Sequence, residues 1–216
     1  MKSDLLKYEK ELYKNHITLI AGVDEVGRGP LVGPVVAAAV ILPKNYVLEG
    51  LNDSKQLSEK KREYFYHILQ KEAVSIGVGI VDALEIDRIN ILEASRKAMY
   101  IALNNLDVEP EYILSDAMSL NDIDIPSRPI IHGDALSLSI AAASVIAKVT
   151  RDHMMYELDQ KYPEYHYKKH KGYPTKEHLE LMRKYGITKE YRMSYKPVKL
   201  ILEEVSREEN KEVVAE

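Results

Sequence analysis

Five short apolar runs along the chain have the length and composition of buried strands. They are rich in Val, Ile and Ala and bounded by turn residues, a pattern that favours strands over helices. The predicted strands are 17–26, 35–42, 74–81, 111–114 and 129–132. The connection between the first two, Gly27-Arg28-Gly29-Pro30, is typical of a turn, so we expect an antiparallel hairpin there.

Between and after these strands, apolar residues recur every three, four or seven positions, as on one face of a helix. Ser58 is a suitable N-cap for the first such segment, and Gly186 ends a later one. The predicted helices are 58–69, one long helix from 89 to about 107, an Ala-rich helix over 136–156, 175–185, and the tail from 198. Strands followed by helices in this order predict an α/β fold with a mixed sheet and helices on its faces.

The chain divides into three segments by composition. Residues 1–16 are charged throughout and predict a short helix or a loose arm. We expect 17–160 to form the main domain. Composition turns basic near Tyr162-Pro163, and we expect 161–216 to be a basic helical segment with an acidic tail that packs on the same domain.

Composition excludes several classes of protein. The 216 residues include no Cys, so a disulfide scaffold and a thiolate zinc site are excluded. The longest apolar runs are too short to cross a bilayer, and the charged N-terminal segment lacks the apolar core of a signal peptide. We therefore expect a soluble, cytoplasmic protein, and no heptad pattern or exposed apolar run requires more than a monomer.

Charge is distributed unevenly along the chain. The formal net charge is −4, but residues 161–199 hold 11 Lys and Arg against 4 Asp and Glu, with 7 of the 15 Tyr. A basic segment interleaved with aromatic rings can bind phosphates and stack on bases or sugars. A solvated surface with half-buried Tyr rings is the alternative, and this segment taken alone favours that alternative.

Four carboxylates lie within or just beyond apolar strands. Burying a carboxylate there is unfavourable in free energy unless it is paired or bound to a cation. Asp24 and Glu25 lie within the first strand, and Asp116 and Asp134 follow two others. The carboxyl ends of strands are where open α/β sheets bind ligands. Clustered carboxylates repel one another, and oxygen ligands suit Mg²⁺ or Mn²⁺. Two such ions about 3.5–4 Å apart support phosphodiester cleavage.

Ordinary structural roles are open for some of these acids. Asp134 could cap the helix that follows, and Asp116 could be a turn residue. A regular strand sends Asp24 and Glu25 to opposite faces, so both can serve one site only if the strand ends, twists or bulges there, which Gly27 favours. Taken as a set at three strand ends, the four acids predict a metal site.

The sequence resembles the ribonuclease HII family. The similarity runs in order from about residue 17 to residue 191 and covers most of the chain. It is carried by AGVDEVGRGPLVGPVVAAAVIL, NDSKQLS, SDAM, HGDALSLSIAAASVIAKVTRD and KHKGYPTKEH, of which DEVGRGP and IAAASVIAKVTRD are together highly specific. One departure is Ala117, which follows Asp116 where many members have Gly.

The resemblance implies an RNase H-like five-stranded mixed sheet and an endonuclease that hydrolyses the RNA strand of RNA–DNA hybrids. It also implies nicking 5′ of single ribonucleotides in duplex DNA, with two Mn²⁺ or Mg²⁺ ions, to give 3′-hydroxyl and 5′-phosphate ends. The family's metal ligands and catalytic residues fall on Asp24, Glu25, Asp116 and Asp134. Its substrate-binding residues fall on Gly27, Arg28 and Gly29, which read the ribose 2′-hydroxyl, on Lys55 of the Asp53-Ser54-Lys55 motif, a phosphate contact, and on the junction-sensing Tyr173.

Two other functions are open from the residues. One is a related nuclease or strand transferase that acts on DNA alone, and the other is a nucleic-acid binder without catalysis. Equal cutting of all-DNA duplex would favour the first, and tight binding without metal or product would favour the second. We interpret Lys148, Arg151 and Asp152, spaced i, i+3 and i+4, as a charge cluster within one helix.

Overall fold

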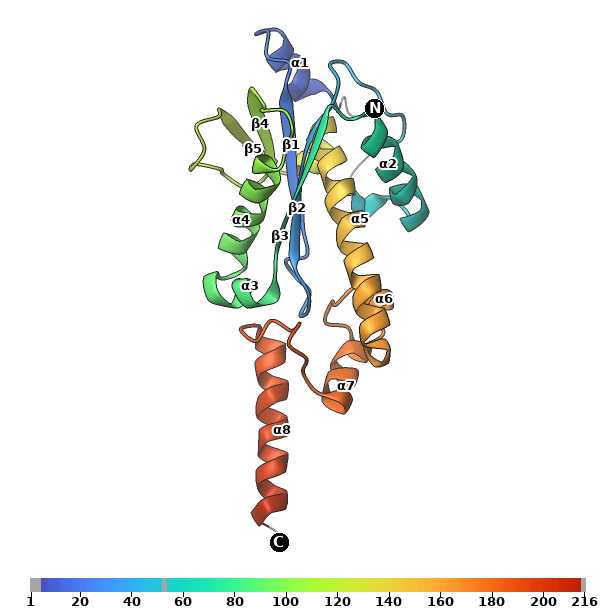
Figure 1. Ribbon diagram of the computed structural model, residues 1–216, viewed down its shortest axis with the longest axis vertical. Helices are drawn as coiled ribbons and strands as arrows, with labels where there is room; N and C mark the ends of the chain where they lie inside the picture. Colours follow the sequence, from blue (N-terminus) through green and yellow to red (C-terminus); the bar gives the residue numbers. More distant parts are fainter. Residues whose placement is uncertain (1–4, 52–53, 215–216) are drawn as a thin grey trace.

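The computed structural model of the protein is built around one mixed five-stranded sheet (Figure 1). The structure describes residues 5–51 and 54–214, with the backbone alone for 208–214. The strands are β1 (Ile20–Val26), β2 (Val35–Ile41), β3 (Ser75–Val81), β4 (Tyr112–Asp116) and β5 (Ser127–Ile130), in the order β3-β2-β1-β4-β5. Strand β1 pairs antiparallel with β2, as the turn chemistry predicts, and parallel with β4.

Helices cover both faces of the sheet. They are α1 (Lys7–Tyr13), α2 (Glu59–Glu72), α3 (Ala83–Ile89), α4 (Ile91–Asn104), α5 (Leu138–Lys161), α6 (Tyr167–His170), α7 (Lys176–Tyr185) and α8 (Lys196–Val214). Helices α3 and α4 lie on one side of the strands, and α5 and α2 lie on the other (Figure 1). The predicted α/β class with helices on both faces is confirmed.

Alternation along the strands divides the core into two layers. Val23 and Ala39 face α4, whereas Ala38 on the same sheet packs with the Ala-rich half of α5. Small residues let the layers approach closely. A Cβ atom at Gly79 of β3 would lie 1.9 Å from the carbonyl oxygen of Ala98 in α4, so only glycine fits there.

The long helix predicted from 89 to about 107 is confirmed as α4, which begins at Ile91 and ends at Asn104. The chain forms two helices, α3 and α4, separated at Asn90, whose φ of 69° is incompatible with a continuous helix. Asn tolerates this backbone region, and its Oδ1 accepts hydrogen bonds from the N–H groups of Leu92 and Glu93. The sequence did not predict α3, because seven residues make only about two turns, too few for a 3.6-residue period to be recognised.

The other boundaries differ by a few residues. Ser58 caps α2 as predicted, since its hydroxyl accepts from the N–H of Lys61. Strand β4 continues to Asp116, β5 begins at Ser127, and α5 continues to Lys161. The longer β4 places Asp116 in the last position of a strand, which matters for the site.

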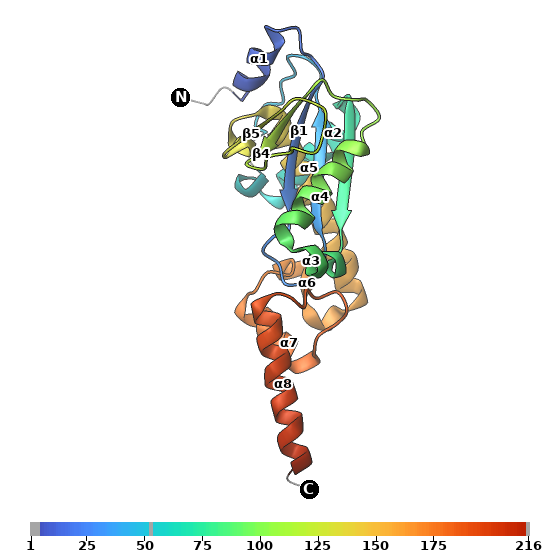
Figure 2. The ribbon, with the colours of Figure 1, turned by 90° about the vertical axis from the view of Figure 1, so that its left-hand side faces the viewer.

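The C-terminal segment packs against the loop that follows β1. A separate hydrophobic cluster joins the two, formed by Leu31, Val32, Met155, Tyr165, Tyr167, Met182, Tyr191, Val198 and Ile201. Beyond these contacts α8 extends away from the sheet, at the end of the molecule opposite α1 (Figures 1 and 2). Within the described ranges, no helix combines the length and the apolar character needed to span a membrane.

Candidate active site

Three carboxylates from separate segments meet at one edge of the sheet. Asp24 lies near the end of β1, Asp116 ends β4, and Asp134 lies in the 3₁₀ turn Gly133–Ala135 before α5. One oxygen of each lies within 4.8 Å of the other two. Because β1 and β4 are parallel neighbours, their carboxyl ends share an edge.

Backbone contacts hold these acids in place. The N–H of Gly133 donates to Asp116 Oδ1 at 2.8 Å, which ties the turn carrying Asp134 to the end of β4. The N–H of Glu25 donates to Asp24 Oδ1 at 2.8 Å. Asp24 and Asp134 are both buried. Burial raises the pKa of Asp24 well above its ordinary value, and the charges of Glu25, Asp116 and Asp134 raise it further.

Glu25 points to the other face of β1 and is outside this group of three. It lines a pocket with Arg28, Arg96 and Asp116. Its Oε1 lies 3.4 Å from Arg28 Nη1, and its buried Oε2 has no hydrogen-bond partner among the described residues. Burial raises the pKa of Glu25 to about 7, although Arg28 acts in the opposite direction. Asp24 and Glu25 of β1 therefore approach Asp116 from opposite faces of the sheet.

The donor set fits a hard divalent cation. Asp24, Asp116 and Asp134 offer only carboxylate oxygens, which suit Mg²⁺ or Mn²⁺. Lys55 Nζ lies 3.5 Å from Asp134 Oδ2, and its side chain is 77% exposed. One exposed lysine cannot neutralise several buried acids, and the unpartnered Oε2 of Glu25 leaves a further oxygen for a cation.

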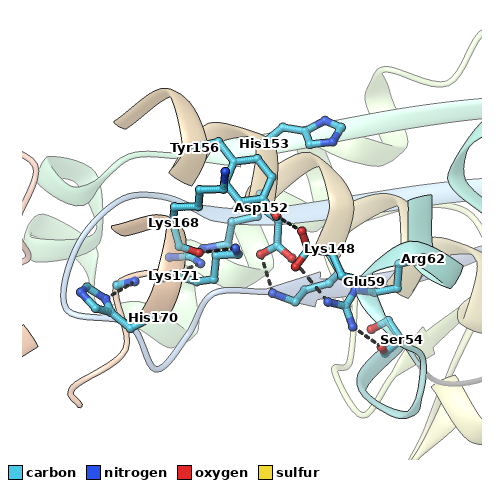
Figure 3. A network of polar contacts seen from close by, with 12 residues as sticks. Ser54, Glu59, Arg62, Lys148, Asp152, His153, Tyr156, Lys168, His170 and Lys171 are labelled. Carbon is cyan, nitrogen blue, oxygen red and sulfur yellow. Dashed lines mark hydrogen bonds and ion pairs between the residues drawn. The ribbon is translucent and has the colours of Figure 1, made fainter. Parts of the chain in front are cut away.

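The segment that carries Lys55 is anchored by a polar network between α2 and α5 (Figure 3). Arg62 Nη1 donates to the carbonyl oxygens of Ser54 and Leu57, and Arg62 Nη2 lies 3.8 Å from Asp152. Lys148 also pairs with Asp152, at 2.5 Å. The interpretation of Lys148 and Asp152 as a pair within one helix is thus confirmed. Asp53 lies outside the described residues.

The glycine loop after β1 lies beside Tyr173. Gly27 adopts φ +95°, and Arg28 extends a half-exposed side chain. A Cβ atom at Gly29 would lie 3.3 Å from the Tyr173 ring, which is 41% exposed. The structure therefore brings Arg28, Gly29 and Tyr173 to one exposed surface, whereas Gly27 is buried beside Arg151.

Ala117 adopts φ +53°, in the left-handed region that favours glycine. This conformation suits glycine, which the resemblance leads us to expect there, and costs the alanine about 1–2 kcal/mol. The turn is held by the N–H of Ala117, which donates to the carbonyl of Ile130 at 2.9 Å. The departure noted in the sequence leaves Asp116 in place.

Two buried arginines beside the glycine loop could not be recognised from the sequence. Arg151, interpreted as part of a charge cluster on one helix, is instead completely buried and donates to carbonyl groups of the loop. Arg192, which no motif singled out, is equally buried and does the same. Neither spacing nor composition distinguishes a buried arginine from an exposed one, because their partners are backbone groups distant in sequence.

Comparisons with known proteins identify the family. A family model described as ribonuclease HII matches residues 21–198. Ribonuclease HII of Geobacillus sp. (strain WCH70) is 53% identical over 200 residues, 93% of this chain and 72% of the relative. Ribonuclease HII of Bacillus cytotoxicus is 55% identical over 196 residues, 91% of this chain and 75% of the relative.

Solved structures show the same fold. Ribonuclease H2 from Pyrococcus horikoshii OT3 is similar with a TM-score of 0.75 and 29% identity, over 86% of this chain and 97% of that chain. Bst-RNase HIII, solved in complex with Mn²⁺, shares the fold with a TM-score of 0.66 and 17% identity, over 91% of this chain and 73% of that one. The chain belongs to the ribonuclease HII family, metal-dependent endoribonucleases that act on RNA–DNA hybrids.

Proposed function

We propose that the protein nicks duplex DNA on the 5′ side of single embedded ribonucleotides, in addition to hydrolysing the RNA of hybrids. The observation that carries this proposal is the position of the acid group next to the glycine loop and Tyr173. A nuclease indifferent to the sugar needs only the acids, whereas the adjoining backbone surface gives a means to sense a 2′-hydroxyl.

The acids are the proposed metal ligands. Asp24, Asp116 and Asp134 share one site and Glu25 approaches Asp116 from the other face, so the four can together hold two ions. When bound, two Mg²⁺ or Mn²⁺ ions supply an activated water and stabilise the departing 3′-oxygen. The raised pKa of Asp24 and the orphaned oxygen of Glu25 are the features that a divalent cation would relieve.

Gly27, Arg28, Gly29 and Tyr173 are the proposed reader of the sugar. Glycines leave backbone groups open to a ribose, because no Cβ atom prevents close approach. The half-exposed Arg28 guanidinium can reach a phosphate, and the exposed face of Tyr173 can stack on the adjoining deoxyribose. Lys55, beside Asp134, is the proposed contact to a neighbouring phosphate.

The basic segment 161–199 is the proposed contact with the rest of the duplex. Its charge would make affinity fall as salt rises, because each neutralised phosphate releases counterions. The segment packs against the glycine loop through Leu31, Val32 and Tyr191, so a duplex bound to it lies beside the same surface.

The test is incubation with labelled duplexes, followed by mapping of the nick. One duplex carries a single ribonucleotide, a matched duplex is all DNA, and a third is an RNA–DNA hybrid. We expect Mn²⁺- or Mg²⁺-dependent cutting of the first and third, ending in a 3′-hydroxyl, and none with EDTA. Equal cutting of the all-DNA duplex would identify a DNA nuclease, and binding without any product would identify a non-catalytic binder.

A further inference from the structure

Two arginines without carboxylate partners are buried behind the glycine loop. Arg151 and Arg192 are both 0% exposed. Within the described part of the chain, neither forms an ion pair with Asp or Glu. An isolated buried charge is costly, so these residues persist only because backbone carbonyls satisfy their N–H groups.

The two guanidinium groups donate to different backbone carbonyls, most of them in the glycine loop. Arg151 Nε, Nη2 and Nη1 donate to the carbonyls of Pro34, Val32 and Lys171 at 3.0–3.2 Å. Arg192 donates to the carbonyls of Gly27 at 2.7 Å, Gly33 at 3.0 Å and Arg28 at 3.1 Å. Both arginines thus hold the end of the loop that leads into β2, and Arg192 in addition holds the two peptide groups within Gly27-Arg28-Gly29.

The contacts of Arg192 decide which way those peptide groups point. In a trans peptide the C=O and the following N–H point in opposite directions. Because the carbonyls of Gly27 and Arg28 point inward at Arg192, the N–H groups of Arg28 and Gly29 point away from it. Neither N–H donates to any residue that the structure describes. Two adjacent amide donors are therefore available on the side away from Arg192.

Neighbouring groups fix Arg192 itself. Tyr195 Oη accepts from Arg192 Nη1 at 3.0 Å and donates to the Arg28 carbonyl at 2.7 Å, so it reinforces the same peptide. Asp87, at the end of α3, accepts from the N–H groups of Met193 at 2.7 Å and Ser194 at 2.9 Å. The segment that carries Arg192 is therefore bonded both to the glycine loop, through Tyr195, and to α3, through Asp87.

We propose that Arg192 is a positioning residue for ribose recognition: it turns the carbonyls of Gly27 and Arg28 inward and so aims the N–H groups of Arg28 and Gly29 at the sugar. This inference rests on the proposed function of the glycine loop. Lysine cannot replace it, because a single ammonium group cannot donate to three carbonyls in the planar geometry of a guanidinium fork.

The experiment compares Arg192→Lys with Arg151→Lys, a matched buried arginine with the same number of carbonyl partners. Binding of a labelled duplex with one ribonucleotide and of a matched all-DNA duplex is measured by fluorescence anisotropy in EDTA. The readout is the Kd for the all-DNA duplex divided by the Kd for the duplex with one ribonucleotide. A loss of folded protein weakens both affinities equally and leaves this ratio unchanged, so a merely structural role does not move it.

We expect the ratio in Arg192→Lys to fall by about tenfold toward 1, the effect of losing a well-formed hydrogen bond, while Arg151→Lys keeps the wild-type ratio. An Arg192→Lys protein with the wild-type ratio would overturn the proposal, as would an equal fall in both variants. A wild-type ratio of 1 would instead overturn the proposed function, and this inference with it.

A second variant covers failure of Arg192→Lys to fold, judged by circular dichroism. Tyr195→Phe keeps the ring beside Arg192 and removes the hydroxyl that accepts from Arg192 and donates to the Arg28 carbonyl. We expect the ratio to fall by about two- to fivefold, since the Arg28 carbonyl loses one of its two donors while the direct bonds from Arg192 remain. An unchanged ratio in a folded Tyr195→Phe protein would contradict the proposal.

Discussion

Two clusters of like charge contact the two ends of segment 24–34, which runs from the end of β1 through the glycine loop. They differ in how their charges are compensated. At the start of this segment, Asp24 meets Asp116 and Asp134 with few donors, and burial and mutual repulsion raise the pKa of Asp24. At its end, Arg151 and Arg192 lie behind the loop, and burial lowers the pKa of both. Six backbone carbonyls satisfy the arginines.

This difference separates a functional cluster from a structural one. The arginines find all their partners within the fold, so they stabilise the loop whether or not a ligand is present. Lys55, Arg28 and two backbone N–H groups offset part of the repulsion among the acids, which still raises the pKa of Asp24, so a bound cation would stabilise their arrangement. We therefore expect substitutions in the two clusters to change stability in opposite directions.

The largest effect is expected for catalysis in the acid cluster. Asp24→Asn should lower the rate of hybrid cleavage by at least about 10²–10³-fold, the cost of removing one group that stabilises transition-state charge. The same variant should be more stable than the wild type in EDTA at pH 8, because a buried, repelled charge is gone. Steady-state kinetics and thermal unfolding check both, with the exposed Asp107→Asn as control. Wild-type cleavage by Asp24→Asn would remove Asp24 from the site.

The arginine cluster should show the opposite sign in stability. Arg151→Met removes the donor from three carbonyls, one buried and two partly buried, at about 1 kcal/mol each, so we expect a loss of about 3 kcal/mol. For a chain of this size that lowers Tm by about 6–12 °C. Arg207→Met, at a side chain that is 77% exposed on α8, is the control and should change stability by less than about 0.5 kcal/mol. Equal stability of both variants would show that Arg151 is dispensable.

Metal should stabilise the protein through the acid cluster. At Mn²⁺ concentrations about 100 times Kd, binding adds about 2.7 kcal/mol and raises Tm by about 5–11 °C. Differential scanning calorimetry with and without Mn²⁺ measures the shift. We expect Asp116→Asn to lose most of it and Arg151→Met to retain it. A shift of the same size in Asp116→Asn would place the ion elsewhere.

A smaller effect is expected from the titration of Glu25. Its pKa is about 7 in the folded protein against an ordinary 4.5, so its stabilising contribution is complete below about pH 4.5 and is lost as pH rises to about 7. In EDTA we expect wild type to lose about 1–3 kcal/mol relative to Glu25→Gln between pH 4.5 and pH 8.

The comparison between these two proteins cancels other titrations over the same range. Burial lowers the pKa of His178 to about 4, and its effect runs the other way, since stability falls as pH falls below 6.5. Urea unfolding of both proteins at each pH gives the difference. A pH-independent difference would show that Glu25 ionises normally.

The smallest effect is expected at the exposed Lys55. Lys55→Met should weaken duplex binding by about two- to fivefold at moderate salt and reduce the slope of log Kd against log salt by about one. Arg207→Met serves again as the control and should leave the slope unchanged. An unaltered slope in Lys55→Met would mean that this lysine contacts no phosphate.

The sequence by itself determined the strands, most helices and the choice of acids. The apolar runs around Asp24 and before Asp116 identify strand ends directly, because a carboxylate in such a run needs a reason to be there. The same patterns did not reveal α3, since a helix of seven residues is too short to show a periodic apolar face. The resemblance supplied Gly27, Arg28, Gly29, Lys55 and Tyr173, whose roles no spacing indicates.

Only the tertiary structure decided how these groups face one another. It placed Glu25 on the opposite face of β1 from Asp24, because alternation persists to the end of the strand. It also showed that Arg151 and Arg192 are buried behind the glycine loop. A pattern of polar and apolar residues shows which side chains avoid water. The partners of a buried arginine can be backbone carbonyls, which every residue has, so no residue type in the sequence marks them. The position of such an arginine therefore becomes visible only when the chain is folded.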